Sequence, residues 1–141
     1  MNWWVWALLS AVFAGLTAVL AKIGVAHVNS HLATALRTSV VVVFTWAIAI
    51  AAAPRGATAS LDRRTCAYLA FSGVATGLSW LCYFRALQLG EVSRVAPIDK
   101  LSVVFALVLA AAVLRERVGW HQWAGCGLIV AGAMVLAWRS S

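Results

Sequence analysis

The chain has very few acidic residues. Four of its 141 residues are Asp or Glu, against eleven Lys or Arg, and the formal net charge is +7. Paired carboxylates serve general acid–base catalysis, and this sequence offers few candidates for such a pair. It also lacks the His-Glu-x-x-His, Gly-x-Ser-x-Gly and phosphate-loop motifs. We therefore expect that the protein is not an enzyme and uses no cofactor.

Cysteine and histidine are also scarce, and their spacing does not indicate a ligand set. Cys66, Cys82 and Cys126 form no Cys-x-x-Cys motif, and we expect them to be buried free thiols. His27 and His31 are four residues apart, a spacing that can place two metal ligands on one helical face. No third ligand lies near them in the sequence, so we expect no metal site.

Charge is rare overall, and apolar residues take its place. Charged residues make up 11% of the chain and hydrophobic residues 64%, whereas ordinary soluble domains have about 25% and 45–50%. A soluble domain this short could not hide so much apolar surface, so lipid must be its solvent. No basic run with interleaved aromatic residues is present. The basic residues therefore indicate contact with lipid head groups rather than with nucleic acid.

Long apolar segments predict an all-α, polytopic membrane protein. About 20 residues are needed to cross the hydrocarbon core as a helix. Five segments qualify, and we expect them to form a single domain over 1–141. Trp3, Trp4 and Trp6, at the start of the first span, form an aromatic anchor at one interface, and Asn29 or Ser30 is expected to be the N-cap of the second. The expected spans are 3–20, 31–53, 65–89, 94–114 and 120–138.

An odd number of spans places the two termini on opposite faces of the membrane. The basic residues can then be sorted by side, and neither side dominates. Because the two sides differ little in their number of basic residues, the positive-inside rule permits insertion in both orientations, in an inner (plasma) membrane. One side holds Arg55, Arg63, Arg64, Arg115 and Arg117; the other holds Lys22, Arg94 and Arg139 in loops, with Arg37, Arg85 and Lys100 inside helices.

Three charged residues lie inside the third and fourth spans: Arg85, Asp99 and Lys100. A charge at the centre of a membrane helix costs about 2.5–3.5 kcal/mol on insertion scales. In a hairpin centred near Val92, Arg85 and Asp99 lie at the same depth, roughly 10 Å from the turn, and could neutralise each other. The cluster either lines a polar cavity that binds substrate or is structural, with the cations reaching towards the interface.

Polar residues also follow one face of the third span. Thr76, Ser79 and Tyr83 continue a stripe that begins at Ser72, and Trp80 borders it. Such a stripe lines a water-filled path or mediates helix packing. Arg37, in the second span, either closes the same cavity or reaches the head groups. The candidate substrate-binding residues are Asp99, Lys100, Arg85, Tyr83, Trp80, Ser79, Thr76 and Arg37.

Small residues form two further patterns. Gly73 and Gly77 are spaced as Gly-x-x-x-Gly in the third span, and Gly127, Ala131 and Gly132 place small residues along the fifth. Small residues let helix backbones approach closely in lipid. The spacing does not decide whether these contacts form within one chain or between two.

Several of these segments together resemble the EamA-like branch of the drug/metabolite transporter superfamily. The resemblance rests on Ala-Lys-Ile-Gly after the first span, Leu-Arg-Thr-Ser in the second, Tyr83-Phe-Arg-Ala-Leu, Ala96-Pro97, and Arg115-Glu116-Arg117 followed by Trp120, Trp123, Gly125 and Leu128-Ile129-Val130-Ala131-Gly132. The likeness covers nearly the whole chain. The wording Ala-Pro-Ile-Asp-Lys-Leu-Ser is similar to that of short, five-helix bacterial members.

The resemblance implies a transporter of small metabolites or drug-like solutes that works by alternating access. Larger members carry two five-helix repeats of opposite orientation, so a chain with one repeat implies a homodimer with antiparallel copies. Small multidrug carriers, which the fifth span also resembles, bind cations through an acidic residue in the first span. This chain has none there. An excess of Arg85 and Lys100 over Asp99 favours an anionic or zwitterionic substrate instead.

Two alternatives remain open at this point. The protein could be a non-transporting membrane subunit that assembles with a different partner, or a flippase for a lipid carrier. A transporter should lose flux when Asp99 or Lys100 becomes apolar, whereas a structural subunit should change only in stability or assembly. Its expected partners are a small-molecule substrate, membrane lipids and a second copy of the chain.

Overall fold

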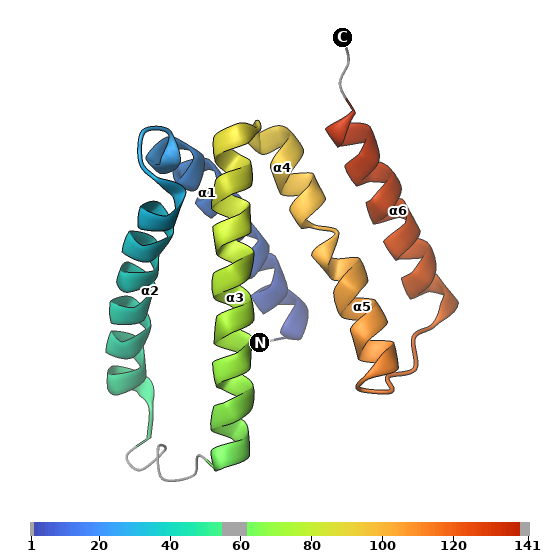
Figure 1. The fold of residues 1–141 in the computed structure, drawn as a ribbon. Helices are drawn as coiled ribbons and strands as arrows, with labels where there is room; N and C mark the ends of the chain where they lie inside the picture. The colour runs from blue at the N-terminus through green and yellow to red at the C-terminus, as the bar shows by residue number, and fades with distance from the viewer. Residues whose placement is uncertain (1, 55–61, 139–141) are drawn as a thin grey trace. The chain divides into compact units, whose positions relative to one another are not determined.

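The described part of the protein is entirely helical in its regular elements. The structure, a computed structural model, describes residues 2–54 and 62–138, so Arg55 and Arg139 lie outside the described residues. The helices, shown in Figure 1, are α1 (Trp3–Val25), α2 (Ser30–Ala52), α3 (Arg63–Leu89), α4 (Val92–Asp99), α5 (Ser102–Ala112) and α6 (Trp120–Ala137). The all-α class is therefore confirmed.

Five helical segments are long and apolar enough to cross a membrane, because α4 and α5 together form one segment, Val92–Ala112. The predicted number of spans is thus confirmed. Large apolar side chains cover the helix surfaces: Ile50, Phe71 and Leu128 are 79%, 74% and 75% exposed. Exposing apolar surface on this scale to water is unfavourable. Helices whose backbone groups are hydrogen-bonded internally can present the same surface to lipid. The protein is a multi-pass membrane protein.

The described residues form two compact units. Unit 1 comprises those within Met1–Leu20 and Leu89–Ser141, and unit 2 comprises those within Ala21–Gln88. Unit 1 thus holds most of α1 with α4, α5 and α6. Unit 2 holds the last turn of α1 with α2 and α3.

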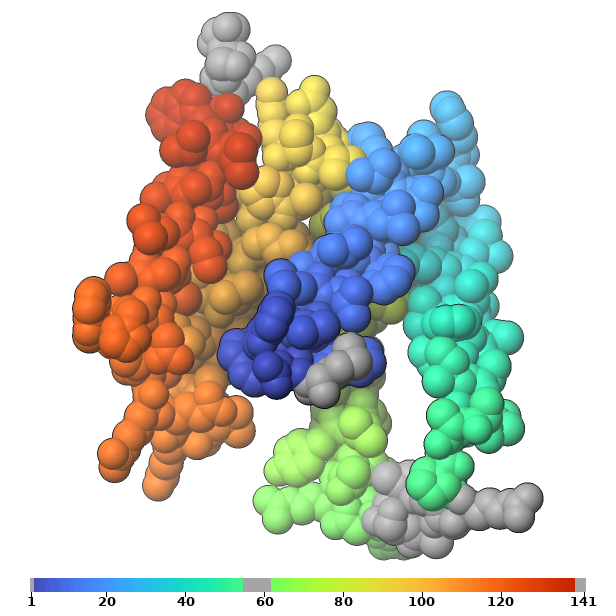
Figure 2. Space-filling model, turned by 180° about the vertical axis from the view of Figure 1, so that it is seen from behind, coloured from blue at the N-terminus to red at the C-terminus, as the bar shows by residue number. Residues whose placement is uncertain are grey.

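Unit 1 is organised by the packing of α6 on α4 and α5. Figure 2 shows α6, in orange and red, beside α4 and α5, and α4 is its main partner. α6 buries Cys126 and Ala133, which are seven residues apart and therefore share one face. Their small side chains permit close approach of the helices. At the start of α6, the N–H of Gly119 donates to Oε1 of Gln122 at 2.6 Å, which satisfies a free helix-end donor.

The fourth span is divided in two, which the sequence pattern does not predict. α4 ends at Asp99 and α5 begins at Ser102, so Lys100 and Leu101 interrupt the segment expected as one helix over 94–114. The interruption therefore includes one of the intramembrane charges and directly follows another. Broken helices at membrane depth are a common way to build polar sites in transporters.

Backbone hydrogen bonding shows how the break arises. Because α4 begins at Val92, Pro97 lies in its second turn, where it has no N–H to donate and its ring crowds the carbonyl of Ser93. Beyond it the ladder tightens to i→i−3 bonds, as between the N–H of Leu101 and the carbonyl of Ile98, at 3.0 Å. In the expected span, which begins at Arg94, Pro97 would lie in the first turn, where proline is tolerated.

Unit 2 is capped by side chains at the start of both its long helices. Asn29 is the N-cap of α2, and its Oδ1 accepts from the N–H of His31 at 2.9 Å, which confirms one of the two predicted caps. Asp62 precedes α3, and its Oδ1 accepts from the N–H of Thr65 at 2.8 Å. Hydrogen bonds from the side chain and N–H of Thr65 lower the pKa of the Asp62 carboxyl.

The buried residues of unit 2 gather at one end. Val25 and Leu87 are fully buried and Phe84 is 3% exposed, whereas α2 beyond Val41 and α3 before Gly77 are exposed throughout their described residues. This end is where α1 finishes, α2 begins and α3 finishes. α1 continues to Val25, beyond the expected 3–20, so Lys22 lies inside the helix.

Candidate functional site

Two long polar side chains fasten the end of α3 to the end of α1 and to the connection that follows it. Nε2 of Gln88 donates to the carbonyl of Val28 at 2.7 Å and to that of Val25 at 3.3 Å. Nζ of Lys22 donates to the carbonyl of Leu87 at 2.5 Å. Carbonyls at helix ends lack hydrogen-bond donors inside their own helix, and lipid tails offer none. The side chains of Gln88 and Lys22 supply these donors.

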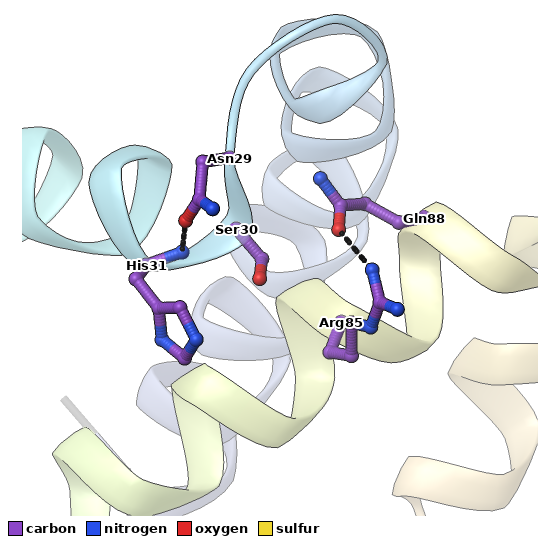
Figure 3. A pocket seen from close by; sticks show the side chains of 5 residues that line it. All are labelled: Asn29, Ser30, His31, Arg85 and Gln88. Atoms are coloured by element: carbon purple, nitrogen blue, oxygen red, sulfur yellow. Dashed lines mark hydrogen bonds between the residues drawn. The ribbon is translucent and has the colours of Figure 1, made fainter.

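A polar pocket lies at this fastened end of unit 2. It has a volume of ≈ 520 Å³, and polar residues from three segments line it (Figure 3). These residues come from the α1–α2 connection, the first turn of α2 and the last turns of α3. The lining residues are Asn29, Ser30, His31, Arg85 and Gln88.

Arg85 supplies the permanent charge of this pocket. Its Nη1 donates to Oε1 of Gln88 at 3.1 Å, as Figure 3 shows. Because Nε2 of Gln88 faces two backbone carbonyls, its Oε1 is the atom left to face Arg85. Gln88 therefore links the guanidinium to the backbone of the α1–α2 connection, while the Arg85 side chain stays exposed.

Arg37 lies against aromatic rings of α3. Its guanidinium carbon is 4.1 Å from the ring centroid of Trp80 and 5.6 Å from that of Phe84. Cation–π attraction of this kind lets a guanidinium remain charged away from bulk water. The structure thus brings together two of the predicted site residues, Arg37 and Trp80, and leaves Tyr83 half-buried on the same helix.

Asp99 and Lys100 lie in unit 1, at the break between α4 and α5. Oδ2 of Asp99 is 3.9 Å from Nζ of Lys100, at the outer limit of an ion pair. One turn before them, Arg94 pairs with Glu91 at 3.4 Å. The proposed partnership of Arg85 with Asp99 would join the two units, and it stays a prediction.

The remaining predicted residues are mostly exposed. Thr76 and Ser79 lie on the surface of α3, where Oγ1 of Thr76 donates to the carbonyl of Ser72 at 2.9 Å. The expected packing residues Gly73, Gly127, Ala131 and Gly132 are exposed too, while Gly77 is half-buried. A Cβ added at any of these four glycines would meet no described atom within 4 Å.

The expected burial of all three thiols is wrong. Cys126 is buried in α6, but Cys66 and Cys82 are exposed on α3. We expect apolar spans to bury their cysteines, yet all described residues of α3 before Gly77 are exposed, as is Cys82 further along it. In the described part of the chain, no three His, Cys, Asp or Glu residues lie together as a metal site would require.

Sequence reasoning missed four residues of the pocket: Asn29, Ser30 and His31 as lining residues, and Gln88 altogether. The sequence pattern indicates only a helix start at Asn29 or Ser30, and it argues against a metal site at His31 without giving that residue another role. Gln88 carried a usable signal, because an uncharged polar residue three positions after Arg85 lies on the same helical face. Its backbone partners near Val25 carry no signature in the sequence.

Comparison with known proteins identifies relatives along the whole chain. The model of the EamA-like transporter family matches residues 1–138. An uncharacterized transporter encoded in the cobO 3' region of a Sinorhizobium species is 48% identical over 136 residues, which is 96% of each chain. No solved structure matches.

Two other relatives have more specific names. A probable 4-amino-4-deoxy-L-arabinose-phosphoundecaprenol flippase subunit, ArnF, of Erwinia tasmaniensis is 39% identical over 72 residues, covering 48% of this chain and 55% of that protein. A probable terminal-alkyne amino-acid exporter of Streptantibioticus cattleyicolor is 35% identical over 138 residues, covering 94% of this chain and 44% of the exporter. With its five membrane-spanning helical segments, the chain belongs to the EamA-like transporter family.

Proposed function

We propose that this protein moves a small solute across the inner membrane by alternating access, with two copies of the chain forming the carrier. One observation carries the proposal: the chain matches the amino-acid exporter over 94% of its own length but over only 44% of the exporter. Two copies would supply about the length of such a carrier. In carriers built from inverted repeats the two halves are antiparallel, so the copies should be antiparallel too.

Exposed small residues on α6 support a dimer. Gly127, Ala131 and Gly132 point away from the face that α6 buries with Cys126 and Ala133. A side of the helix lined by small residues suits close contact with a second membrane helix. The weak asymmetry of basic loop residues supports copies of opposite orientation.

The proposed substrate is anionic or zwitterionic. Arg85 and Lys100 outnumber Asp99, and the relative that exports an amino acid is named for a zwitterionic solute. The proposed binding residues are those predicted from the sequence, Asp99, Lys100 and Arg85 first among them. A helix break at a charged pair supports this assignment, because it exposes backbone groups as well as side chains.

A reporter fused to the C-terminus tests the antiparallel arrangement. Signal from both sides of the membrane is expected, whereas a single orientation contradicts an antiparallel homodimer. Transport is tested in liposomes with Lys100→Met and Asp99→Leu, which keep side-chain size and remove charge. Both should abolish amino-acid flux while helical content stays unchanged. Arg117→Gln, in the α5–α6 loop, is the matched control and should transport normally.

The flippase-subunit relative of Erwinia tasmaniensis favours a second candidate function. It supports the alternative that this chain assembles with a different partner and moves a lipid-linked substrate. Purification of the chain expressed alone separates the two: a stable dimer that catalyses flux supports the homodimeric carrier. Monomers that gain activity only with a co-expressed second protein support the alternative.

A further inference from the structure

Unit 2 has almost no negative charge of its own. Between Ala21 and Gln88 the sequence contains six basic residues and one acidic residue, Asp62. Asp62 caps the start of α3, and Arg85 follows 23 positions later, a separation of roughly 34 Å along a helix. Asp62 therefore cannot neutralise Arg85. The basic residues are Lys22, Arg37, Arg55, Arg63, Arg64 and Arg85.

Arg85 is held by a neutral group rather than by a carboxylate. Its bond to Gln88 engages one of the five guanidinium N–H donors and leaves the charge uncompensated within unit 2. The Gln88 amide cannot turn round without losing its bonds to Val25 and Val28. The guanidinium is thus positioned in advance, which lowers the entropy cost of binding a ligand.

The rest of the pocket adds hydrogen-bond donors. Oδ1 of Asn29 accepts from the N–H of His31, so the Asn29 NH₂ group is the part that can donate into the pocket. The pocket also contains the start of α2, where the helix dipole favours negative charge. The Ser30 hydroxyl and the His31 ring complete the lining, which contains no carboxylate among the residues that the structure describes. In Figure 3 these groups and Arg85 surround one space.

We propose that this pocket binds an oxyanion, the carboxylate or phosphate group of a solute or of a lipid head group. A guanidinium with several neutral donors is the set that recognises such groups most strongly. The proposal deepens the proposed function by naming the chemical group on the substrate, and it makes Arg85 and His31 contact residues. Gln88 is a positioning residue, because it acts through Arg85.

The test is a binding measurement on the purified full-length protein in maltoside detergent micelles, whose head groups carry neither phosphate nor carboxylate. Inorganic phosphate and acetate are titrated and the heat of binding is measured. Wild-type protein should bind at least one probe, and Arg85→Gln should weaken that binding by about tenfold or more. Arg64→Gln removes the same charge at the other end of α3 and should bind as wild type does. The absence of binding, or equal binding by Arg85→Gln, overturns the proposal.

Two additions keep the test decisive. If Arg85→Gln does not fold, His31→Ala removes one donor from an exposed side chain and should weaken binding by a few-fold; unchanged binding overturns the proposal. Arg85→Lys keeps the charge without the planar fork and should bind with an affinity between those of wild type and Arg85→Gln.

Mixed micelles of the same detergent with added phosphatidylglycerol distinguish the two sources of the oxyanion. Loss of phosphate binding in these mixed micelles identifies a lipid head group as the occupant, and unchanged binding identifies a soluble one. Flux in liposomes is measured separately. Binding that depends on Arg85 without any flux would contradict the proposed function alone, while flux without such binding would contradict this inference alone.

Discussion

The two units hold their charges in different ways. Unit 1 contains three of the four acidic residues, and its basic residues Arg94 and Lys100 each lie near a carboxylate. Unit 2 has one acidic residue, at the far end of α3 from its pocket. Two of its cations, Arg37 and Arg85, lie instead against aromatic rings and a neutral amide.

The difference indicates where a ligand can contribute most. A cation beside its own carboxylate gains little from an added anion, because the two anions compete for it. A cation held by neutral groups keeps its full attraction for an anion. We therefore propose that unit 2 is the better acceptor of a negatively charged substrate group, although the sequence alone placed the emphasis on Asp99 and Lys100.

The largest expected effect comes from Gln88. Gln88→Leu removes three hydrogen bonds, takes the donor from the Val28 carbonyl and leaves the Val25 carbonyl only the long bond from the Val28 N–H, which should lower the free energy of unfolding by roughly 2–3 kcal/mol. Unfolding in mixed detergent micelles, followed by circular dichroism, measures it. Gln88→Glu keeps an acceptor for Arg85 but loses the donors. Comparable loss in both variants would show that the carbonyl bonds dominate, and no loss in either would contradict the fastening role.

The stacking of Arg37 on Trp80 should give a smaller effect. A double-mutant cycle with Arg37→Met and Trp80→Leu should show a coupling free energy of about 1 kcal/mol in the same unfolding assay. Arg64 and Tyr68 form the control pair, because they lie at 5.8 Å on the exposed start of α3 and should show coupling near zero. Equal coupling free energies in both cycles would contradict the expectation that the Arg37–Trp80 contact is stronger than the exposed Arg64–Tyr68 contact.

The ion pair of unit 1 should contribute less again. Glu91 and Arg94 are three residues apart, and their side chains are 71% and 41% exposed. Glu91→Gln should lower the free energy of unfolding by roughly 0.3 kcal/mol, and high salt should remove this difference. A loss several times larger, or one that salt does not affect, would mean that the charges of unit 1 are not simply neutralised at the surface.

The smallest effect concerns acid and Asp62. Its pKa is lowered in the folded protein, so its contribution to stability is complete above the ordinary pKa of Asp, about 3.9, and is lost as the pH falls through the lowered value. Asp62→Asn keeps a capping side chain and should remove this loss. Unfolding curves at neutral and acidic pH measure it. A steeper acid dependence in the variant would reverse the expected sign.

Much of the fold follows from the sequence, because span length and hydropathy are local properties. The five segments and the cap at Asn29 were predictable for this reason. The break at Lys100 was not, since it depends on α4 beginning at Val92 and so placing Pro97 inside the helix. A shift of two residues in a helix start changes a tolerated proline into a disruptive one.

The site was less predictable, because its contacts join distant parts of the chain through the backbone. Arg85 and Arg37 could be singled out as charges in apolar spans. The bonds of Gln88 to Val25 and Val28 span 63 and 60 positions and end on carbonyls, which every residue has. Sequence pattern therefore finds the charged member of the pocket and misses the neutral residues that hold it.

The exposed thiol in the first turn of α3 has a practical consequence. Cys66 lies at the start of the membrane-spanning segment Arg63–Leu89, where a water-soluble reagent can reach it, whereas Cys82 lies well inside that segment and Cys126 is buried in α6. A membrane-impermeant maleimide added to one side of sealed vesicles should therefore modify Cys66 wherever that end of the segment faces the reagent. Partial modification that becomes complete after the vesicles are opened would show mixed insertion without any fused tag, so the native chain carries its own orientation marker.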